Sequence, residues 1–425
     1  MPETAPQPLD AAPVSHTMVV PADAAVEPDY PALPDAPAVC VFESAGTPPR
    51  SILIATTASA RDLARRRFGV GADTSPARSA RPDLHALCLG GRVLAIAVGS
   101  SLEADAVYLR QARERLPHLA RVVAERWRAW FVHVDPEAEF PQWTKTNLSI
   151  GLVGKRSAST AIGGGSLPKG LILGPVPDKD AAGRLIESLI DCFDLCRYHN
   201  LLVQAPRAVA CAYKEMGRCP APCDGSETMV RYRERVAAAA AAITLGVDGA
   251  IATAQEQMQR AAASEQFEAA AKIQKEIGRL RTLDKPAFSQ VRTLHSWREL
   301  LVLPGAAKGR CTGALFDRGA LLRIADIDSA DPASAVAACE AARAWLARDP
   351  APSPRDATSI PPDTIDTIAL VSRWLFTPKA RRKGEVVRSA DGRFEAEDLL
   401  GAAASVGRPK KHAVEIDGQE IEGAG

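Results

Sequence analysis

The sequence predicts an α+β protein built from several domains. Short apolar runs typical of strands alternate with amphipathic helices up to residue 195, and the same mixture returns after residue 286. Between them lie a cysteine-rich segment, residues 196–226, and an almost wholly helical region, residues 227–285. At 425 residues, the chain is long enough for two or three domains, each with its own apolar core.

Composition limits the classes of function. The 52 basic and 51 acidic residues nearly cancel, so the chain lacks the strong positive charge of a general nucleic-acid binder, and any DNA contact must be local. The nine cysteines follow no secretory leader, which favours a reducing, cytoplasmic compartment over a disulfide framework. No apolar run reaches the length of a membrane span.

The N-terminal third is predicted to hold a disordered tail and a small α+β domain. Residues 1–36 are rich in Pro, Ala, Asp and Glu and lack apolar periodicity, so we expect disorder there. Residues 37–130 then alternate strands and helices. The expected strands are 38–42, 52–55 and 93–98, and the expected helices are 58–68 and 102–114.

Residues 131–195 form a predicted connecting subdomain that closes with a helix over 181–193. In the helical region, residues 227–245 favour one helix, Gly246 ends it, and Asp248 is placed to cap the next. A third helix follows Ser264. Its apolar side chains recur every three or four residues and share one face: Phe267, Ala270, Ile273, Ile277 and Leu280.

The C-terminal part is predicted to be a small α+β domain, residues 286–349, followed by a linker, one helix and a polar tail, residues 350–425. Paired strands are expected over 299–303 and 313–326, and helices over 333–347 and 364–376. A basic run at 379–383 could touch phosphates, and a solvated surface is the alternative.

Four cysteines within 28 residues suggest a metal centre: Cys196, Cys211, Cys219 and Cys223. Turns rich in Gly and Pro can bring such thiolates together, and either tetrahedral zinc or an iron–sulfur cluster accepts four of them. The alternative is that these cysteines are buried without a metal.

The run Cys211-Ala-Tyr-Lys-Glu-Met-Gly-Arg-Cys219-Pro-Ala-Pro-Cys223-Asp-Gly resembles the cysteine segment of the UvrC family, the incision subunits of bacterial nucleotide excision repair. The resemblance implies an iron–sulfur cluster, with zinc as the alternative. The family's first cysteine falls at Tyr198 in this chain, so Cys196, or else Cys192, must take its role.

A second stretch resembles the UVR motif, the helical hairpin through which UvrC pairs with UvrB. The residues that carry the resemblance are Met258, Ala261, Phe267, Glu268, Ala270 and Ala271. Alanine-rich stripes let helices approach closely, while Phe267 and Met258 offer large apolar contacts to a partner. The resemblance therefore implies a UvrB-like partner. An ordinary internal hairpin with its own core is the alternative.

The order of elements in residues 37–130 resembles the GIY-YIG nuclease domain that opens UvrC proteins, but its catalytic residues are not matched. The tyrosine places fall at Cys40 and Leu53, and Arg110 occupies the place of the metal-binding glutamate. Since a cation repels a metal ion, we predict no cutting by the family mechanism. Arg65 and Arg66 could still hold DNA backbone, with a solvated helix face as the alternative.

These features predict a UvrC-like protein of nucleotide excision repair that binds a UvrB-type partner and DNA, without GIY-YIG catalytic residues. Two other functions remain open. One is an active endonuclease of the excinuclease type that uses nonstandard residues. The other is a non-catalytic adaptor that regulates repair.

Overall fold

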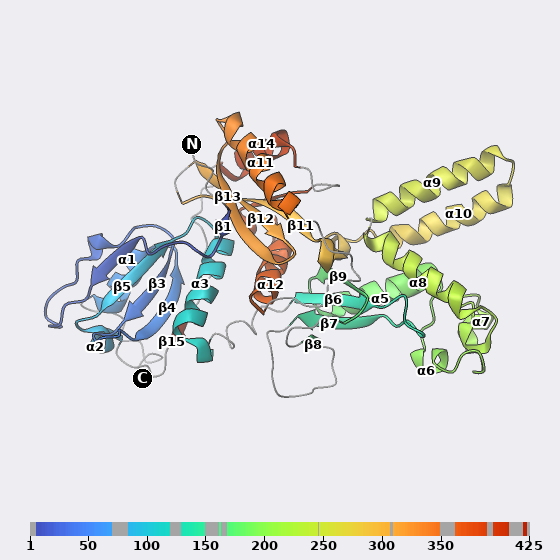
Figure 1. The fold of residues 1–425 in the computed structure, drawn as a ribbon, viewed down its shortest axis with the longest axis horizontal. Helices are drawn as coiled ribbons and strands as arrows, with labels where there is room; N and C mark the ends of the chain where they lie inside the picture. The colour runs from blue at the N-terminus through green and yellow to red at the C-terminus, as the bar shows by residue number, and fades with distance from the viewer. Residues whose placement is uncertain are drawn as a thin grey trace. The chain divides into compact units, whose positions relative to one another are not determined.

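The computed structural model describes residues 6–69, 84–119, 129–148, 161–162, 168–244, 246–306, 309–348, 362–388, 394–407 and 420–422. The chain forms two units (Figure 1). Unit 1 comprises Met1–Trp127, Arg298–Pro350 and Phe376–Gly425, and unit 2 comprises Arg128–Trp297 and Ala351–Leu375. Helices and largely antiparallel sheets occur in both units, which confirms the α+β class.

The first sheet of unit 1 has the strand order β15-β4-β3-β5-β2. Its centre, β3 (Ala38–Glu43), pairs antiparallel with β4 (Ser51–Thr57) and β5 (Arg92–Ala97). Helix α1 (Ala60–Phe68) packs Leu63, Ala64 and Phe68 into the core on one face, α2 (Leu84–Cys88) adds Cys88, and α3 (Ser101–Arg115) contacts β3 and β4.

Both long helices of this sheet begin at serine caps. The Ser59 hydroxyl accepts from the Asp62 N–H at 3.1 Å, and the Ser100 hydroxyl accepts from the Glu103 N–H at 3.1 Å. The Glu103 carboxylate in turn accepts from the Gly99 N–H at 2.7 Å. These bonds satisfy N–H groups that the helix itself leaves unpaired.

The second sheet of unit 1 has the order β1-β13-β12-β11-β14. Its long strands are β11 (Arg298–Pro304), β12 (Arg310–Asp317) and β13 (Ala320–Asp328). Helices α11 (Pro332–Arg348) and α14 (Ala396–Gly407) pack against it around a core that includes Leu300, Leu315 and Leu399.

The predicted disorder of residues 1–36 is wrong for residues 6–36. Strand β1 (Gln7–Pro8) pairs with β13, β2 (His16–Val19) pairs with β5, and a short 3-10 helix, η1 (Tyr30–Ala32), follows. The reason is that four apolar side chains of this segment are buried in the core of the first sheet: Met18, Val20, Tyr30 and Leu33.

The predicted polar tail also contributes to the fold. Strand β14 (Glu385–Val387) extends the second sheet, α14 packs on it, and β15 (Glu420–Glu422) pairs with β4. The short helix α13 (Lys379–Arg382) contains most of the basic run. Predicted strands 299–303 and 313–326 correspond to three observed strands, because a turn at Arg318 and Gly319 divides the second.

Unit 2 is built on a sheet of order β10-β9-β6-β7-β8. Its strands are β6 (Ala129–Val134), β7 (Thr144–Leu148), β8 (Ala161–Ile162), β9 (Leu171–Val176) and β10 (Arg292–Thr293). Helix α5 (Lys179–Phe193) contacts the sheet, and Asp178 caps its start. Helix α12 (Pro362–Phe376) matches the helix predicted over 364–376.

After α5 come two short helices, α6 (His199–Leu202) and α7 (Ala212–Glu215), and the 3-10 turn η3 (Pro222–Asp224). Three longer helices follow: α8 (Met229–Thr244), α9 (Val247–Ala263) and α10 (Phe267–Leu280). Gly246, not Asp248, is the N-cap of α9, so Asp248 lies inside the first turn. The 3-10 turns η4 (Arg281–Leu283), η5 (Pro286–Phe288) and η6 (Leu294–Ser296) lead back to the sheet.

One core joins these parts of unit 2. It contains Leu185 and Leu189 of α5, Tyr232 and Val236 of α8, and Ile277 of α10. No single helix among the described residues is long and apolar enough to cross a membrane, and α8 with α9 passes that test only as a pair bent by 117°.

Candidate functional site

The cysteine segment begins where α5 ends. Asp194 takes a left-handed conformation with φ of 51°, and the N–H groups of Asp194 and Leu195 both donate to the Ile190 carbonyl oxygen. This ends the helix and turns the chain. The next residue, Cys196, donates its N–H to the Tyr232 hydroxyl oxygen at 3.2 Å. Tyr232 is buried, so this bond anchors the main chain at Cys196 to the core.

The segment closes in a turn that contains two buried cysteines, Cys219 and Cys223. The turn depends on positive φ angles of 56° at Ala221 and 83° at Gly225. The Ala208 N–H donates to the Cys223 carbonyl oxygen at 3.0 Å, which fastens the preceding loop to the turn.

A lysine from α7 secures the same turn. Lys214 Nζ lies 2.5 Å from an Asp224 carboxylate oxygen and 2.7 Å from the Ser226 hydroxyl oxygen. Lys214, with help from Ser226, lowers the pKa of Asp224 to about 2.

Two of the four predicted ligands meet directly. The interaction between the neighbouring Cys196 and Cys219 thiols lowers the pKa of Cys219 to about 7 and raises the pKa of Cys196, whose thiol also donates to the Tyr198 carbonyl oxygen at 3.6 Å. Burial raises the pKa of Cys223, and the nearby Cys219 and Cys211 thiols raise it further. All four thiols therefore lie within electrostatic reach of a neighbour in the set.

The arrangement stops short of a complete ligand sphere. Among the described residues, no three histidine, cysteine, aspartate or glutamate side chains are gathered closely enough to hold a metal ion. Cys192, the other candidate for the first ligand, packs in the core of unit 2, where burial raises its pKa to about 12. The donor chemistry suits a soft metal, and Cys196 is better placed than Cys192.

Arg197 gives independent support for a negatively charged group at this place. Its guanidinium lies 4.4 Å from the centre of the Tyr213 ring and is ion-paired with Asp191, yet its Nη1 atom is buried and has no hydrogen-bond partner among the described residues. Arg197 also favours the Cys219 thiolate. A buried guanidinium N–H without an acceptor fits a metal–thiolate centre that carries negative charge. Sequence reasoning missed Arg197 because nothing in the spacing marks it.

The second predicted site is the α9–α10 hairpin, whose helices run side by side (Figure 1). The N–H groups of Ser264, Glu265 and Gln266 donate to carbonyl oxygens of the last turn of α9, and Glu265 has φ of 58°. This left-handed residue reverses the chain in three residues, so the two helices become neighbours.

Exposure rises along the apolar stripe of α10 from base to tip. Leu280 and Ile277 are buried, Ile273 and Ala270 are half-buried, and Phe267 is 69% exposed. All ten phenylalanines lie in the described part of the chain, and Phe267 alone is exposed. The base of the hairpin is thus folded into unit 2, while its tip presents an uncovered ring.

The other predicted partner-binding residues lie along the same hairpin. Met258 and Ala261 of α9 are half-buried, and Met258 packs against the core of unit 2. Glu268 and Ala271 of α10 are exposed. Met258 therefore has a structural role, and Phe267, Glu268 and Ala271 are the residues available to a partner.

In unit 1, the places of the missing nuclease residues lie partly inside the protein. Cys40 and Leu53 are buried in β3 and β4, where they face the core that α1 covers. Arg110 lies on α3, with its guanidinium 2.7 Å from Glu114 and 3.8 Å from Asp10. Glu114, the larger influence, and Asp10 raise the pKa of Arg110, so it stays a cation.

The two predicted DNA-binding arginines lie on the exposed side of α1. Arg65 lies 3.8 Å from Asp62 and 5.9 Å from the centre of the Tyr30 ring, and its side chain is 55% exposed. Arg66 is exposed and makes no hydrogen bond or ion pair with any described residue. Arg67 is instead ion-paired with Glu420 of β15. Arg66 is the more available of the two predicted residues.

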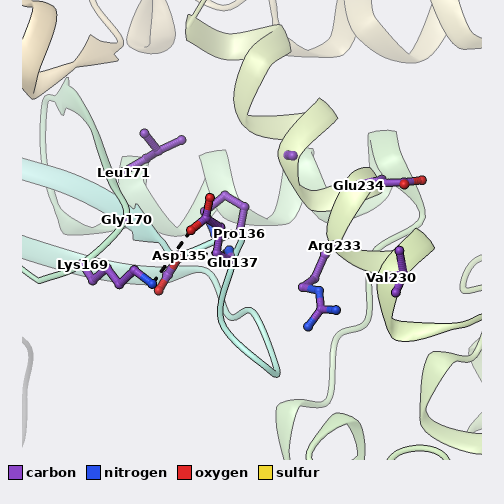
Figure 2. Close-up of a pocket in the computed structure, with 10 residues that line it drawn as sticks. Asp135, Pro136, Glu137, Lys169, Gly170, Leu171, Val230, Arg233 and Glu234 are labelled. Atoms are coloured by element: carbon purple, nitrogen blue, oxygen red, sulfur yellow. Dashed lines mark hydrogen bonds and ion pairs between the residues drawn. The ribbon is translucent and has the colours of Figure 1, made fainter. Parts of the chain in front are cut away.

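Unit 2 also contains a pocket of 530 Å³ that sequence reasoning missed. Figure 2 shows one wall made by the turn after β6 and the start of β9, and the other by α8. Val230, Arg233, Glu234 and Ala237 line it at the spacing of one helix face, while on the opposite wall Lys169 lies 3.9 Å from Glu137. That helical spacing in the sequence was the available signal.

Comparisons with known proteins place similarity in unit 2. Residues 153–242 match the family described as UvrC/Cho excinuclease, middle domain, and residues 248–283 match the UvrB/uvrC motif. The UvrABC system proteins C of two strains of Thermus thermophilus are each 34% identical over 118 residues, 27% of this chain. The chain spans 20% and 19% of the lengths of these relatives. No solved structure matches.

Proposed function

We propose that this chain is a member of the UvrC family and that it binds a UvrB-type partner with the tip of the α9–α10 hairpin. The matches to the UvrC/Cho middle domain and to the UvrB/uvrC motif support this proposal. The observation that carries the proposal is the exposure of Phe267 at the end of a stripe whose other members are buried or half-buried. Covering an exposed phenylalanine contributes roughly 1.5–3 kcal/mol, enough to make one residue a binding hot spot.

Calorimetric titration of the full chain with a purified UvrB-type protein tests this proposal. Phe267→Asp places a charge at the centre of the contact, so we expect the dissociation constant to rise at least about 30-fold. Val336→Asp on α11 is the matched control, because Val336 is also exposed, at 45%, but lies in unit 1. Equal affinity of Phe267→Asp and wild type would show that the hairpin has only a structural role.

We further propose that unit 1 holds DNA backbone without cutting it by GIY-YIG chemistry. Two observations support this. Arg66 offers a cation on the exposed side of α1 that no described residue pairs with, and Arg110, at the place of a metal-binding glutamate, is a cation held between two carboxylates. Such a chain would take part in nucleotide excision repair as a partner of the incision machinery.

Duplex binding followed over a range of salt concentrations tests the DNA contact. Arg66→Ala should weaken binding to every duplex sequence alike and reduce the slope of log affinity against log salt by about one. Arg348→Ala, another exposed arginine of unit 1, should leave the slope unchanged. Incision of a lesion-bearing duplex by the chain with a divalent metal, abolished by Arg66→Ala, would overturn the claim of lost chemistry.

We also propose that Cys196, Cys211, Cys219 and Cys223 hold an iron–sulfur cluster, with zinc as the alternative. The thiol contact between Cys196 and Cys219 and the buried, unpaired Arg197 Nη1 support it. A bound metal centre would cross-link the two ends of a segment in which Leu202 is the only buried side chain between Tyr198 and Arg218.

Iron, sulfide and zinc analysis after anaerobic purification tests the metal proposal. We expect about one metal centre per chain in wild type and its loss in Cys219→Ser. Cys192→Ala is the control, because Cys192 packs in the core and should keep the metal. Metal-free wild type, or equal metal content in all three proteins, would remove the proposal.

A further inference from the structure

The segment between the first and last cysteines carries an aromatic and cationic cluster on its surface. It comprises Arg197, Tyr198, Tyr213 and Arg218. The Tyr198 and Tyr213 rings lie 6.0 Å apart at an angle of 49°, and the Arg197 guanidinium lies 4.4 Å from the centre of Tyr213. The Arg218 N–H donates to the Tyr213 carbonyl oxygen at 2.9 Å, so the four residues are contiguous.

The outer ring of this cluster is open. Tyr198 is 45% exposed, whereas Tyr213 is half-buried and contacts both Tyr198 and Arg197. The Tyr198 main chain is fixed, because its carbonyl oxygen accepts from the N–H groups of Leu201 and Leu202 at 3.0 Å. The residue is therefore anchored by its backbone and contacts Tyr213, while 45% of its surface stays open to solvent.

The cluster also contains two guanidinium groups that contact one carboxylate. Arg197 and Arg218 both contact the same Asp191 carboxylate oxygen, Arg218 at 3.3 Å. One carboxylate cannot neutralise two guanidinium groups. The Arg218 side chain is 53% exposed, so it can reach a further anion without leaving the protein surface.

We infer that this cluster binds an unpaired DNA strand, with one base stacked on the open side of Tyr198 and the adjacent phosphate at Arg218. Aromatic rings backed by arginine are suited to bases because every base has a π-face and every linkage has a phosphate. A paired base is already stacked between its neighbours, so the site should favour single strands over duplex. The inference rests on the proposed function only in taking DNA as the ligand.

Fluorescence anisotropy with a labelled 12-nucleotide oligo-dT and with a duplex of equal length tests the inference, using the full chain at constant metal content. Tyr198→Ala should weaken single-strand binding about tenfold and leave duplex binding unchanged. Tyr198→Phe should bind within twofold of wild type, because it keeps the ring. Arg218→Ala should lower the salt slope for the single strand by about 0.7.

Two further variants make the test independent of folding defects. Tyr198→Trp keeps a stacking surface and should bind at least as tightly, with its fluorescence quenched by the bases. Val209→Ala changes a neighbouring side chain that is 86% exposed and should have no effect. The inference is overturned if wild type does not bind the single strand. It is also overturned if Tyr198→Ala binds the single strand as tightly as wild type, or weakens duplex binding by the same factor. A protein partner for this surface would give the first of these results.

These outcomes differ from failure of the proposed function. Partner binding depends on Phe267 in the hairpin, and duplex binding depends on Arg66 in unit 1, so each can be lost while the Tyr198 effect remains. Conversely, both can hold while Tyr198→Ala changes nothing.

Discussion

Cys192 and Cys196 lie four residues apart but have different surroundings. Cys192 packs in the core among apolar side chains, and its thiol stays protonated. Cys196 lies beyond the end of α5, donates its N–H to Tyr232 and meets the Cys219 thiol. The sequence could favour Cys196 only by its spacing, because burial and thiol contacts depend on where the helix ends. Tyr198, at the place of the family's first cysteine, instead exposes an aromatic ring.

His295 provides a test of burial at the residue scale. Burial lowers its pKa below 6.5, so the folded protein favours the neutral ring while the unfolded chain protonates at about 6.5. Below pH 6.5 the unfolded state binds the His295 proton more readily than the folded state does, so the free energy of unfolding should fall. The fall should end once the pH is below the lowered pKa of the folded state. Above pH 6.5 the ring is neutral in both states, so this loss of stability should be absent.

Urea unfolding at pH 7.5 and at pH 5.0 measures this effect. His295→Gln should lose less stability between these values than wild type does, whereas His16→Gln, at an exposed position, should behave as wild type. The same loss in all three proteins would contradict the assignment.

At the scale of elements, periodic helices were predictable and isolated short strands were not. Helix α10 follows from apolar side chains spaced three and four residues apart, and α8 and α11 follow from long runs rich in strong helix formers such as alanine. Strands β1, β2, β14 and β15 have two to four residues each, too few for a period. They form because a distant strand offers an unpaired edge, which no local pattern reveals.

The same limit explains the sites. Cysteine spacing and the hairpin pattern are local signals, so the sequence identified them. The Arg197–Tyr213 contact joins side chains from two separate segments. The pocket likewise forms only where α8 lies opposite the turn after β6 and the start of β9. The sequence also could not predict that exposure differs along α10, because only the structure shows which part of the helix packs into the core of unit 2.

The two ends of the hairpin should respond differently to truncation. Ile277 is buried at the base, so Ile277→Ala should lower the free energy of unfolding by about 2–4 kcal/mol. Phe267→Ala at the exposed tip should change it by less than about 0.5 kcal/mol yet weaken partner binding. Denaturant unfolding combined with the calorimetric titration separates the two. A stability loss for Phe267→Ala as large as that for Ile277→Ala would mean that the tip is packed.

At the scale of the whole molecule, the two sheets of unit 1 exchange terminal strands. β1, from the N-terminus, joins the sheet of β11–β13, and β15, from the C-terminus, joins the sheet of β3–β5. The sheets also meet closely at Gly99, where a Cβ would lie 2.4 Å from the Pro304 carbonyl oxygen. These links favour cooperative unfolding of unit 1.

Removing residues 408–425 tests the exchange. The truncated chain loses the pairing of β15 with Leu53–Ala55 and the ion pair between Arg67 and Glu420. Backbone amides of β4 should then exchange with deuterium faster, while amides of β11 and β12 keep their protection. Unchanged exchange in β4 would show that β15 contributes nothing to the first sheet.

The central proposal is that this chain binds a UvrB-type partner through Phe267 and does not cut DNA by GIY-YIG chemistry. An incision assay with a complete UvrC protein, its partners and a lesion-bearing duplex tests it most directly. Added wild-type chain should lower the incision rate in proportion to its concentration, and Phe267→Asp should not. Incision by the chain in the absence of UvrC, or equal inhibition by wild type and Phe267→Asp, would contradict the claim.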